Sequence, residues 1–164
     1  MRLILIRHAK TESDPPKGGK DFDRVLTERG RHEATRLGVR LAEAGYTPDV
    51  AVVSGAARTR ETWEYVTKAW GAIETNAFRE LYDSDPATIL EYARKAGAET
   101  VAVVVHNPGA QLLAVDLMRR AGADEEARRA EGKFPTASAV VAELRGSEPR
   151  FEAVFYPEDD PADR

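Results

Sequence analysis

The chain has 164 residues, of which 42% are hydrophobic, and a formal net charge of −4 at pH 7. This length suits a single domain with a sizeable core, and the mildly acidic balance argues against a nucleic-acid partner. The absence of cysteine excludes disulfides, cysteine nucleophiles and thiolate metal sites. No apolar stretch approaches the ~18 residues of a membrane span, so we expect a cytoplasmic protein with no membrane partner.

Short apolar runs alternate with amphipathic stretches along the chain. Ala34, Leu37 and Leu41, for example, are three and four residues apart, which places them on one face of a helix. In chain order, the sequence predicts a strand at 3–7, a polar loop at 13–25, a helix capped by Thr27 and running to about Ala44, a strand at 50–53 and a helix at 57–70. It then predicts a helix capped by Asp85, opened by Pro86 and closed by Gly97, a strand at 101–105, a helix from Pro108 to near Gly122, and strands at 139–144 and 151–156.

This alternation predicts an α/β fold with a mostly parallel central sheet. The last two runs flank Gly146-Ser147 and would form an antiparallel edge. No internal repeat or linker divides the chain, so we expect one domain over residues 1–157. The acidic residues 158–164 would form a flexible tail.

Polar residues follow each of the three apolar strands. Arg7 and His8 follow the first, Arg58 lies at the helix start after the second, and His106 and Asn107 follow the third. The carboxyl ends of parallel strands meet at one edge of a sheet, where α/β proteins bind ligands. Two arginines, two histidines and two helix N-termini would converge there, which suits a tetrahedral anion such as phosphate.

Each of these residues also has an ordinary structural explanation. A single histidine after a strand more often caps or packs, Arg58 alone more often is a solvated helix charge, and His106 could satisfy a turn. Taken together these explanations are weaker, because polar residues of the same kinds would then have to follow three separate strands by chance. Within a cationic cluster, the neutral imidazole of His8 could attack phosphorus and form a covalent phosphohistidine. His32 lies on an amphipathic helix, and we expect it at the surface.

Three ordered motifs carry a resemblance to a known family. Arg7-His8-Ala9 resembles the Arg-His-Gly signature of the histidine phosphatase (phosphoglycerate mutase-like) superfamily. Residues 53–62 resemble its second motif, and residues 103–107 resemble its distal histidine strand. Residues 23–30 and the short length look most like the SixA-type phosphohistidine phosphatase branch. The resemblance implies a three-layer α/β/α sandwich of the phosphoglycerate mutase type, with no metal or cofactor.

The resemblance also implies roles for the residues at the strand ends. His8 would be the nucleophile, and Arg7, Arg58 and His106 would hold the phosphoryl oxygens. Thr11, Arg24 and Asn107 would add substrate contacts. Glu80, in the segment Phe78–Tyr82, is the candidate general acid, and the alternative for it is a surface carboxylate that pairs with Arg79.

The expected function is therefore a phosphatase that works through a phosphohistidine on His8. The chain lacks the large insertions that cover the active site in mutases of this superfamily, so we expect an open pocket that suits phosphohistidine on a protein partner. Two departures from the family pattern are Ala9 in place of glycine and no proline in Ser54-Gly55-Ala56. The alternatives are a small-molecule phosphomonoesterase or mutase acting on a small phosphorylated substrate, and a non-catalytic phosphate-binding module.

Overall fold

The computed structural model describes residues 1–163 of the chain. In chain order the elements are β1 (Arg2–Arg7), a 3₁₀ turn (Asp21–Asp23), α1 (Glu28–Glu43), β2 (Val50–Ser54), α2 (Ala57–Val66), a 3₁₀ turn (Thr67–Ala69), β3 (Glu74–Phe78), a 3₁₀ turn (Arg79–Leu81), α3 (Pro86–Lys95), β4 (Thr100–Val105), α4 (Gly109–Arg120), α5 (Asp124–Gly132), β5 (Ala139–Glu143), β6 (Arg150–Phe155) and two 3₁₀ turns (Pro157–Asp159, Pro161–Asp163).

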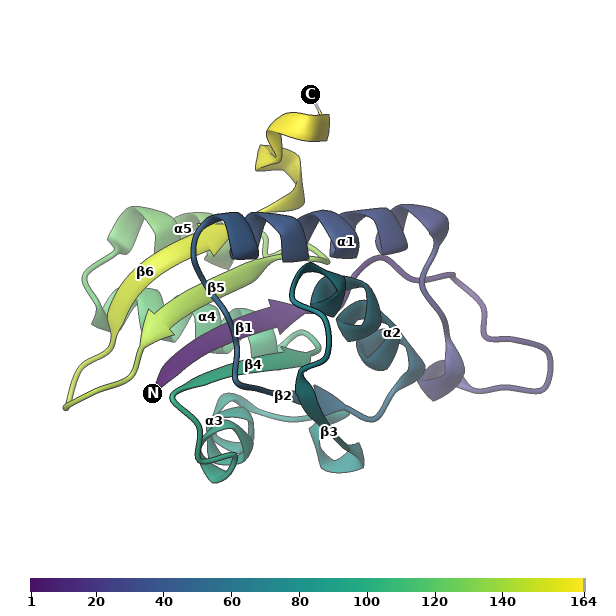
Figure 1. Cartoon of the computed structure of the whole chain (residues 1–164), viewed down its shortest axis with the longest axis horizontal. Helices are drawn as coiled ribbons and strands as arrows, with labels where there is room; N and C mark the ends of the chain where they lie inside the picture. Colours follow the sequence, from purple (N-terminus) through teal and green to yellow (C-terminus); the bar gives the residue numbers. More distant parts are fainter. Residues whose placement is uncertain (164) are drawn as a thin grey trace.

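The strands form one six-stranded sheet in the order β3-β2-β4-β1-β5-β6. The first four strands in this order pair in parallel, whereas β5 runs antiparallel to both β1 and β6. Helices cover both faces of the sheet (Figure 1): α1 and α2 lie on one face, and α3, α4 and α5 lie on the other. The predicted α/β/α sandwich with an antiparallel edge is therefore confirmed.

Burial on both faces explains why the central strands are almost wholly apolar. Successive side chains of a strand point to opposite faces, so Leu3 and Leu5 join the core beneath α3–α5 while Ile4 and Ile6 join the core beneath α1 and α2. All four side chains are fully buried. A continuous apolar run is what such a two-sided strand requires.

Capping residues set the starts of two helices as the sequence predicts. The Thr27 hydroxyl accepts a hydrogen bond of 2.9 Å from the Gly30 N–H at the start of α1. The Asp85 carboxylate accepts one of 2.8 Å from the Thr88 N–H at the start of α3, where Pro86 is the first helical residue. The helix predicted over 57–70 is shorter: α2 ends at Val66 and a 3₁₀ turn follows.

Two elements have no counterpart among the predicted ones. β3 is an edge strand whose residues are mostly exposed, and it pairs with β2 alone. α5 is rich in charged residues and buries only Ala127 and Ala130. Neither segment carries the apolar periodicity from which strands and helices are predicted.

The C-terminal residues expected to form a flexible tail make ion pairs with the rest of the protein. Asp160 is 1% exposed and forms a two-pronged ion pair with Arg36 of α1, at 2.8 and 3.0 Å. Arg129 of α5 pairs with Glu158 and Asp159. These ion pairs fasten the tail to helices on both sides of the sheet. Residue 164 of the expected tail lies outside the described residues.

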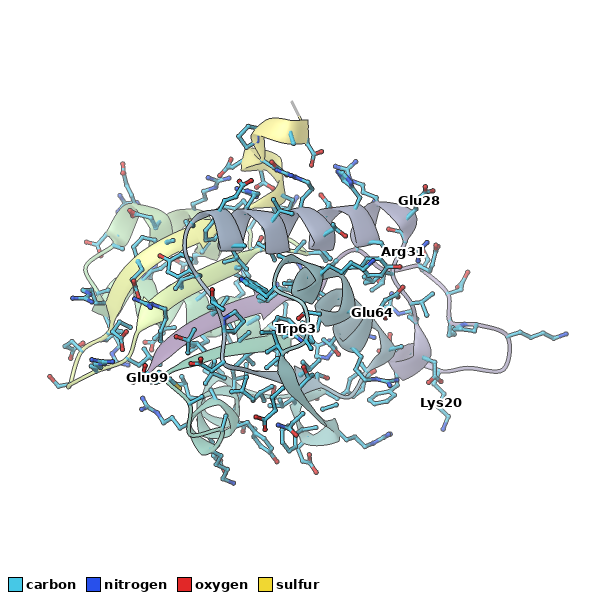
Figure 2. All side chains as sticks on the ribbon, in the orientation of Figure 1. Lys20, Glu28, Arg31, Trp63, Glu64 and Glu99 are labelled. Carbon is cyan, nitrogen blue, oxygen red and sulfur yellow. The ribbon has the colours of Figure 1, made fainter. Side chains whose placement is uncertain are left out.

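The register of the sheet brings the polar strand ends together. Arg7 lies opposite Val105, and Val53 lies opposite Val104, so the chain leaves β1, β2 and β4 at one edge. Figure 2 shows Lys20, in the long loop after β1, and Glu99, just before β4, at opposite ends of the molecule. The candidate site lies at the Lys20 end. No helix within residues 1–163 is long and apolar enough to cross a membrane.

Candidate active site

His8 is buried directly after β1, with its ring held in one orientation. Its exposure is 7%, and its Nδ1 lies 2.8 Å from the carbonyl oxygen of Ala9. Because a carbonyl oxygen can only accept a hydrogen bond, Nδ1 carries the proton and Nε2 keeps its lone pair. The N–H of Ala9 is itself bonded to the Thr62 hydroxyl of α2 at 2.9 Å, which fixes the backbone behind the ring. The geometry leaves Nε2 free to act as a nucleophile.

His106 lies beside His8, directly after β4. The two ring centroids are 5.3 Å apart, and His106 is 8% exposed. Its Nε2 lies 2.7 Å from the hydroxyl oxygen of Ser54 at the end of β2. When that hydroxyl donates to Nε2, the ring proton sits on Nδ1, which is buried and has no hydrogen-bond partner in residues 1–163.

Two arginines complete a set of unpaired nitrogen donors. Arg58, in the first turn of α2, is 7% exposed, and Arg7 ends β1. The buried side-chain nitrogens without a hydrogen-bond partner in residues 1–163 are Nε of Arg7, Nε of Arg58 and Nδ1 of His106. A buried donor without a partner is costly, so three from one strand-end cluster indicate a site for an anion.

Burial and neighbouring cations keep both imidazoles neutral. Burial is the larger cause of the lowering of the pKa of His8 to about 4, and Arg7, Arg58 and Arg24 add to it. Burial also lowers the pKa of His106 to about 3, with further contributions from the cations around it. Both rings are therefore uncharged near pH 7, and His8 is in the protonation state that a nucleophile needs.

The loop after β1 folds back over this cluster. Arg24 donates hydrogen bonds of 2.9 Å to the Thr11 hydroxyl and of 3.0 Å to the carbonyl oxygen of Glu12. It also donates one of 2.9 Å from Nε to the Asp21 carboxylate. Arg24 lies within electrostatic reach of His8, since it contributes to the lowered pKa of that ring. The structure thus places Arg24 and the Thr11 that it binds beside the cluster, and their role as substrate contacts stays a prediction.

Asp21 and Tyr82 also reach the site, although neither was a sequence-predicted site residue. Arg58 donates from Nη1 to the Asp21 carbonyl oxygen at 2.9 Å and from Nη2 to the carboxylate at 3.2 Å. The Tyr82 hydroxyl donates to the same carboxylate oxygen. The Tyr82 ring packs edge-on against His106, with centroids 5.4 Å apart. The spacing of Asp21 three residues before Arg24 was the available signal, since it allows an ion pair within one turn.

One predicted site residue, Glu80, lies away from the cluster. Glu80 is exposed and lines a separate groove with Glu74, Phe78 and Tyr92, so the structure does not bring it to His8. The residue of this segment that reaches His106 is Tyr82, two residues later. The physical reason is that the 3₁₀ turn Arg79–Leu81 buries Leu81, which directs Glu80 outward. The structure therefore does not place Glu80 beside His8, and its role as general acid stays a prediction.

Asn107 is adjacent to His106, but its side-chain amide is used within the fold. Its oxygen accepts a hydrogen bond of 3.1 Å from the Gln111 N–H in the first turn of α4, and its nitrogen donates to the carbonyl oxygen of Phe134 at 3.2 Å. Arg7 donates from Nη1 to the same carbonyl oxygen at 3.0 Å. The Phe134 carbonyl oxygen thus accepts from both Asn107 and the Arg7 guanidinium.

Comparisons with known proteins agree with this arrangement. Residues 3–85 match the histidine phosphatase superfamily (branch 1). An uncharacterised protein of Mycobacterium leprae, ML1117, is 30% identical over 147 residues, which cover 86% of this chain and 88% of that protein. The mitochondrial serine/threonine-protein phosphatase PGAM5 of Xenopus laevis is 42% identical over 66 residues; the match covers 40% of this chain and only 23% of that relative's length.

Solved structures show the same architecture over nearly the whole chain. A structure provisionally assigned as the phosphohistidine phosphatase SixA of Agrobacterium tumefaciens is 31% identical, with a TM-score of 0.81, over 95% of this chain and 97% of that one. The chain therefore belongs to the histidine phosphatase superfamily, and its fold is the phosphoglycerate mutase-like fold that the SixA structure shares.

Proposed function

We propose that this protein hydrolyses phosphohistidine in proteins through a covalent phosphohistidine intermediate on His8. The observation that carries the proposal is the set of unpaired buried nitrogens on Arg7, Arg58 and His106, beside a histidine whose Nε2 keeps its lone pair. Three donors can hold the three equatorial oxygens of a transferring phosphoryl group. Similarity to the SixA structure supports phosphohistidine as the substrate class.

In the first step, the Nε2 lone pair of His8 attacks phosphorus, and the bond between phosphorus and the leaving group breaks. The electron pair of that bond goes to the leaving nitrogen of the substrate imidazole. Arg7, Arg58 and His106 donate hydrogen bonds to the phosphoryl oxygens, on which charge develops. Throughout, the ring proton of His8 stays on Nδ1, which donates its hydrogen bond to the Ala9 carbonyl oxygen.

In the second step, water attacks phosphorus on the far side from His8. The phosphorus–Nε2 bond breaks, and its electron pair returns to the imidazole, which leaves as the neutral ring it was at the start. The proton lost by water goes to the released phosphate or to solvent. The low pKa of His8, about 4, makes the ring a good leaving group as well as a free nucleophile.

The deciding experiment compares His8→Ala with the wild type on an aryl phosphate and on a phosphohistidine peptide. We expect turnover of both substrates to fall by at least about 10³-fold, because the nucleophile is gone, while inorganic phosphate still binds. His32→Ala is the matched control, since His32 is exposed on α1. Wild-type turnover that persists in His8→Ala would contradict the mechanism.

Trapping separates the enzyme from a phosphate-binding module. Wild-type protein that is quenched in alkali during turnover should carry an acid-labile phosphoryl group on His8, identified by mass spectrometry of the proteolysed chain. Phosphate binding without any covalent adduct or turnover would identify a binding module instead. Turnover of small phosphorylated metabolites with no turnover of the phosphohistidine peptide would favour the phosphomonoesterase or mutase alternative.

A further inference from the structure

The carboxylate of Asp21 connects three parts of the candidate site. Its Oδ1 accepts a hydrogen bond from Nε of Arg24, in the loop, and its Oδ2 accepts from Nη2 of Arg58, in α2. The hydroxyl of Tyr82, after the turn that follows β3, donates to Oδ2 as well. Four groups on three segments thus hold the residue, because its backbone carbonyl also binds Nη1 of Arg58.

Asp21 lies at the mouth of the site and not among the buried donors. Its side chain is 56% exposed, whereas His8 and His106 are 7% and 8% exposed. Its charge nevertheless reaches the centre, since it acts on His106 and raises the pKa of that ring against the larger lowering effects. An in-line displacement places the leaving group on the side of phosphorus opposite the nucleophile. With His8 at the floor, the leaving group points toward the mouth, where Asp21 lies.

The carboxylate is an anion at neutral pH. The hydrogen bond from Tyr82 is the largest cause of its low pKa, about 2, and Arg58 and Arg24 lower it further. It therefore has no proton to donate to a leaving group. A negative charge at the mouth, where the leaving group would lie, favours a cationic leaving group over a neutral or anionic one, so its presence is informative about the substrate.

We propose that Asp21 is a specificity-determining residue that stabilises the imidazolium form of the phosphohistidine substrate at the mouth of the site. This inference rests on the proposed function and deepens it. In phosphohistidine, one ring nitrogen carries phosphorus and the other can carry a proton, which makes the ring a cation. The carboxylate favours that cation by charge and by accepting a hydrogen bond from its N–H.

The cationic ring needs no general acid. When Nε2 of His8 attacks, the phosphorus–nitrogen bond breaks and its electron pair enters the imidazolium ring, which departs as neutral imidazole with its proton still on the other nitrogen. A phosphate ester has no such cation, and its leaving oxygen needs a proton that neither Asp21 nor the outward-facing Glu80 supplies. The charge of Asp21 thus favours nitrogen-linked phosphoryl groups over oxygen-linked ones.

The test compares kcat/KM for a histidine peptide phosphorylated with phosphoramidate and for p-nitrophenyl phosphate, in the wild type and in Asp21→Asn. A neighbouring opposite charge shifts a pKa by about one unit or more, so the ratio of the two kcat/KM values should fall at least about tenfold in Asp21→Asn. The alkaline limb of kcat for the peptide should also move to lower pH by about one unit, because the bound imidazolium loses its counter-charge.

Two further variants isolate the charge. Asp21→Glu keeps the carboxylate and should retain an alkaline limb near that of the wild type. Asp23→Asn neutralises an exposed carboxylate in the same turn, which accepts a hydrogen bond from the Lys20 N–H, and should leave both substrates unaffected. The titratable groups that interact with Asp21 are Arg24, Arg58, Tyr82 and His106, and all are intact in each variant. Thermal melts establish that the variants remain folded.

The outcomes separate this inference from the proposed function. If Asp21→Asn lowers both kcat/KM values by the same factor with an unmoved alkaline limb, Asp21 only positions Arg58; the inference is then overturned and the proposed function stands. If the wild type hydrolyses p-nitrophenyl phosphate but not the peptide, the proposed substrate class fails, and the inference fails with it. A selective loss for the peptide that Asp21→Glu reverses supports both.

Discussion

At the scale of single residues, chemistry at the candidate site depends on which nitrogen of each histidine carries the proton. The Ala9 carbonyl oxygen assigns the proton of His8 to Nδ1, and the Ser54 hydroxyl can leave the proton of His106 on Nδ1 as well. Two identical side chains thus take different roles: Nε2 of His8 offers a lone pair for attack, and Nδ1 of His106 can donate a hydrogen bond. The backbone and strand-end neighbours, and not the imidazoles themselves, make this difference.

The buried imidazoles should titrate well below the usual range for histidine. An NMR pH titration of the ring resonances, assigned with His8→Ala and His106→Ala, should give midpoints of about 4 for His8 and about 3 for His106. Both pKa values are lowered because burial and nearby guanidinium groups disfavour the protonated, cationic form of the ring. Nucleophilic activity should therefore be retained as the pH falls to about 5 and be lost through about 4. A midpoint between 6 and 7 for either ring would show that the site is more hydrated than the structure indicates.

At the scale of elements, a close contact between α1 and α2 positions Arg58. Gly38 of α1 faces the end of α2, and a Cβ at this position would lie 2.1 Å from the carbonyl oxygen of Val66. This distance is far below any van der Waals contact, so only glycine allows the two helices to approach this closely. The approach sets how α2 lies on the sheet, and hence where its first turn presents Arg58.

Gly38→Ala should separate the two helices and destabilise the fold. The inserted methyl group meets backbone, which cannot rotate away, so we expect a loss of about 1–3 kcal/mol in the free energy of unfolding. Urea denaturation followed by circular dichroism measures it. Gly132→Ala is the control, because nothing lies within 4 Å of the added Cβ, and better helix propensity should leave that variant as stable as the wild type or slightly more stable. Equal stability of the two variants would contradict the tight packing.

Elements were predictable where their local signals were strong. Thr27 and Asp85 cap helices as their positions after loops predict, and the fully buried runs after Leu3 and Val101 form the central strands. β3 was not predictable, because its residues are polar and exposed and only pairing with β2 makes it a strand. Local propensity is a weak guide at a sheet edge, since the hydrogen-bonding partner decides the structure there.

At the scale of the whole molecule, the C-terminal residues join the two helical layers. Arg36 binds the buried carboxylate of Asp160 from the α1 side, and Arg129 binds Asp159 from the α5 side. Arg40 of α1 also donates a hydrogen bond to the carbonyl oxygen of Tyr156. Composition alone suggested a solvated acidic tail; the arginines that neutralise it come from distant parts of the chain.

Asp160→Ala should destabilise the protein by about 2–3 kcal/mol, because it leaves the Arg36 guanidinium without its two-pronged partner. Thermal or urea denaturation at pH 7 measures the loss. Arg36 lowers the pKa of Asp160 to about 2, so the stabilisation should be complete above about pH 4 and fade as the pH falls toward 2. Glu158→Ala is the control, since that side chain is 54% exposed, and it should cost less than about 1 kcal/mol. A loss for Asp160→Ala no larger than this would indicate a loosely held tail.

The amino-acid sequence by itself determined the architecture and the four residues at the strand ends, Arg7, His8, Arg58 and His106. These follow from buried apolar runs and from motifs that lie within a few residues of one another, so local order carries them. The tertiary structure decided that Tyr82 and Asp21 reach the site while Glu80 faces away, and that the tail is docked through Asp160. Such contacts depend on how a turn buries Leu81 and on partners more than thirty residues away, which no local pattern encodes.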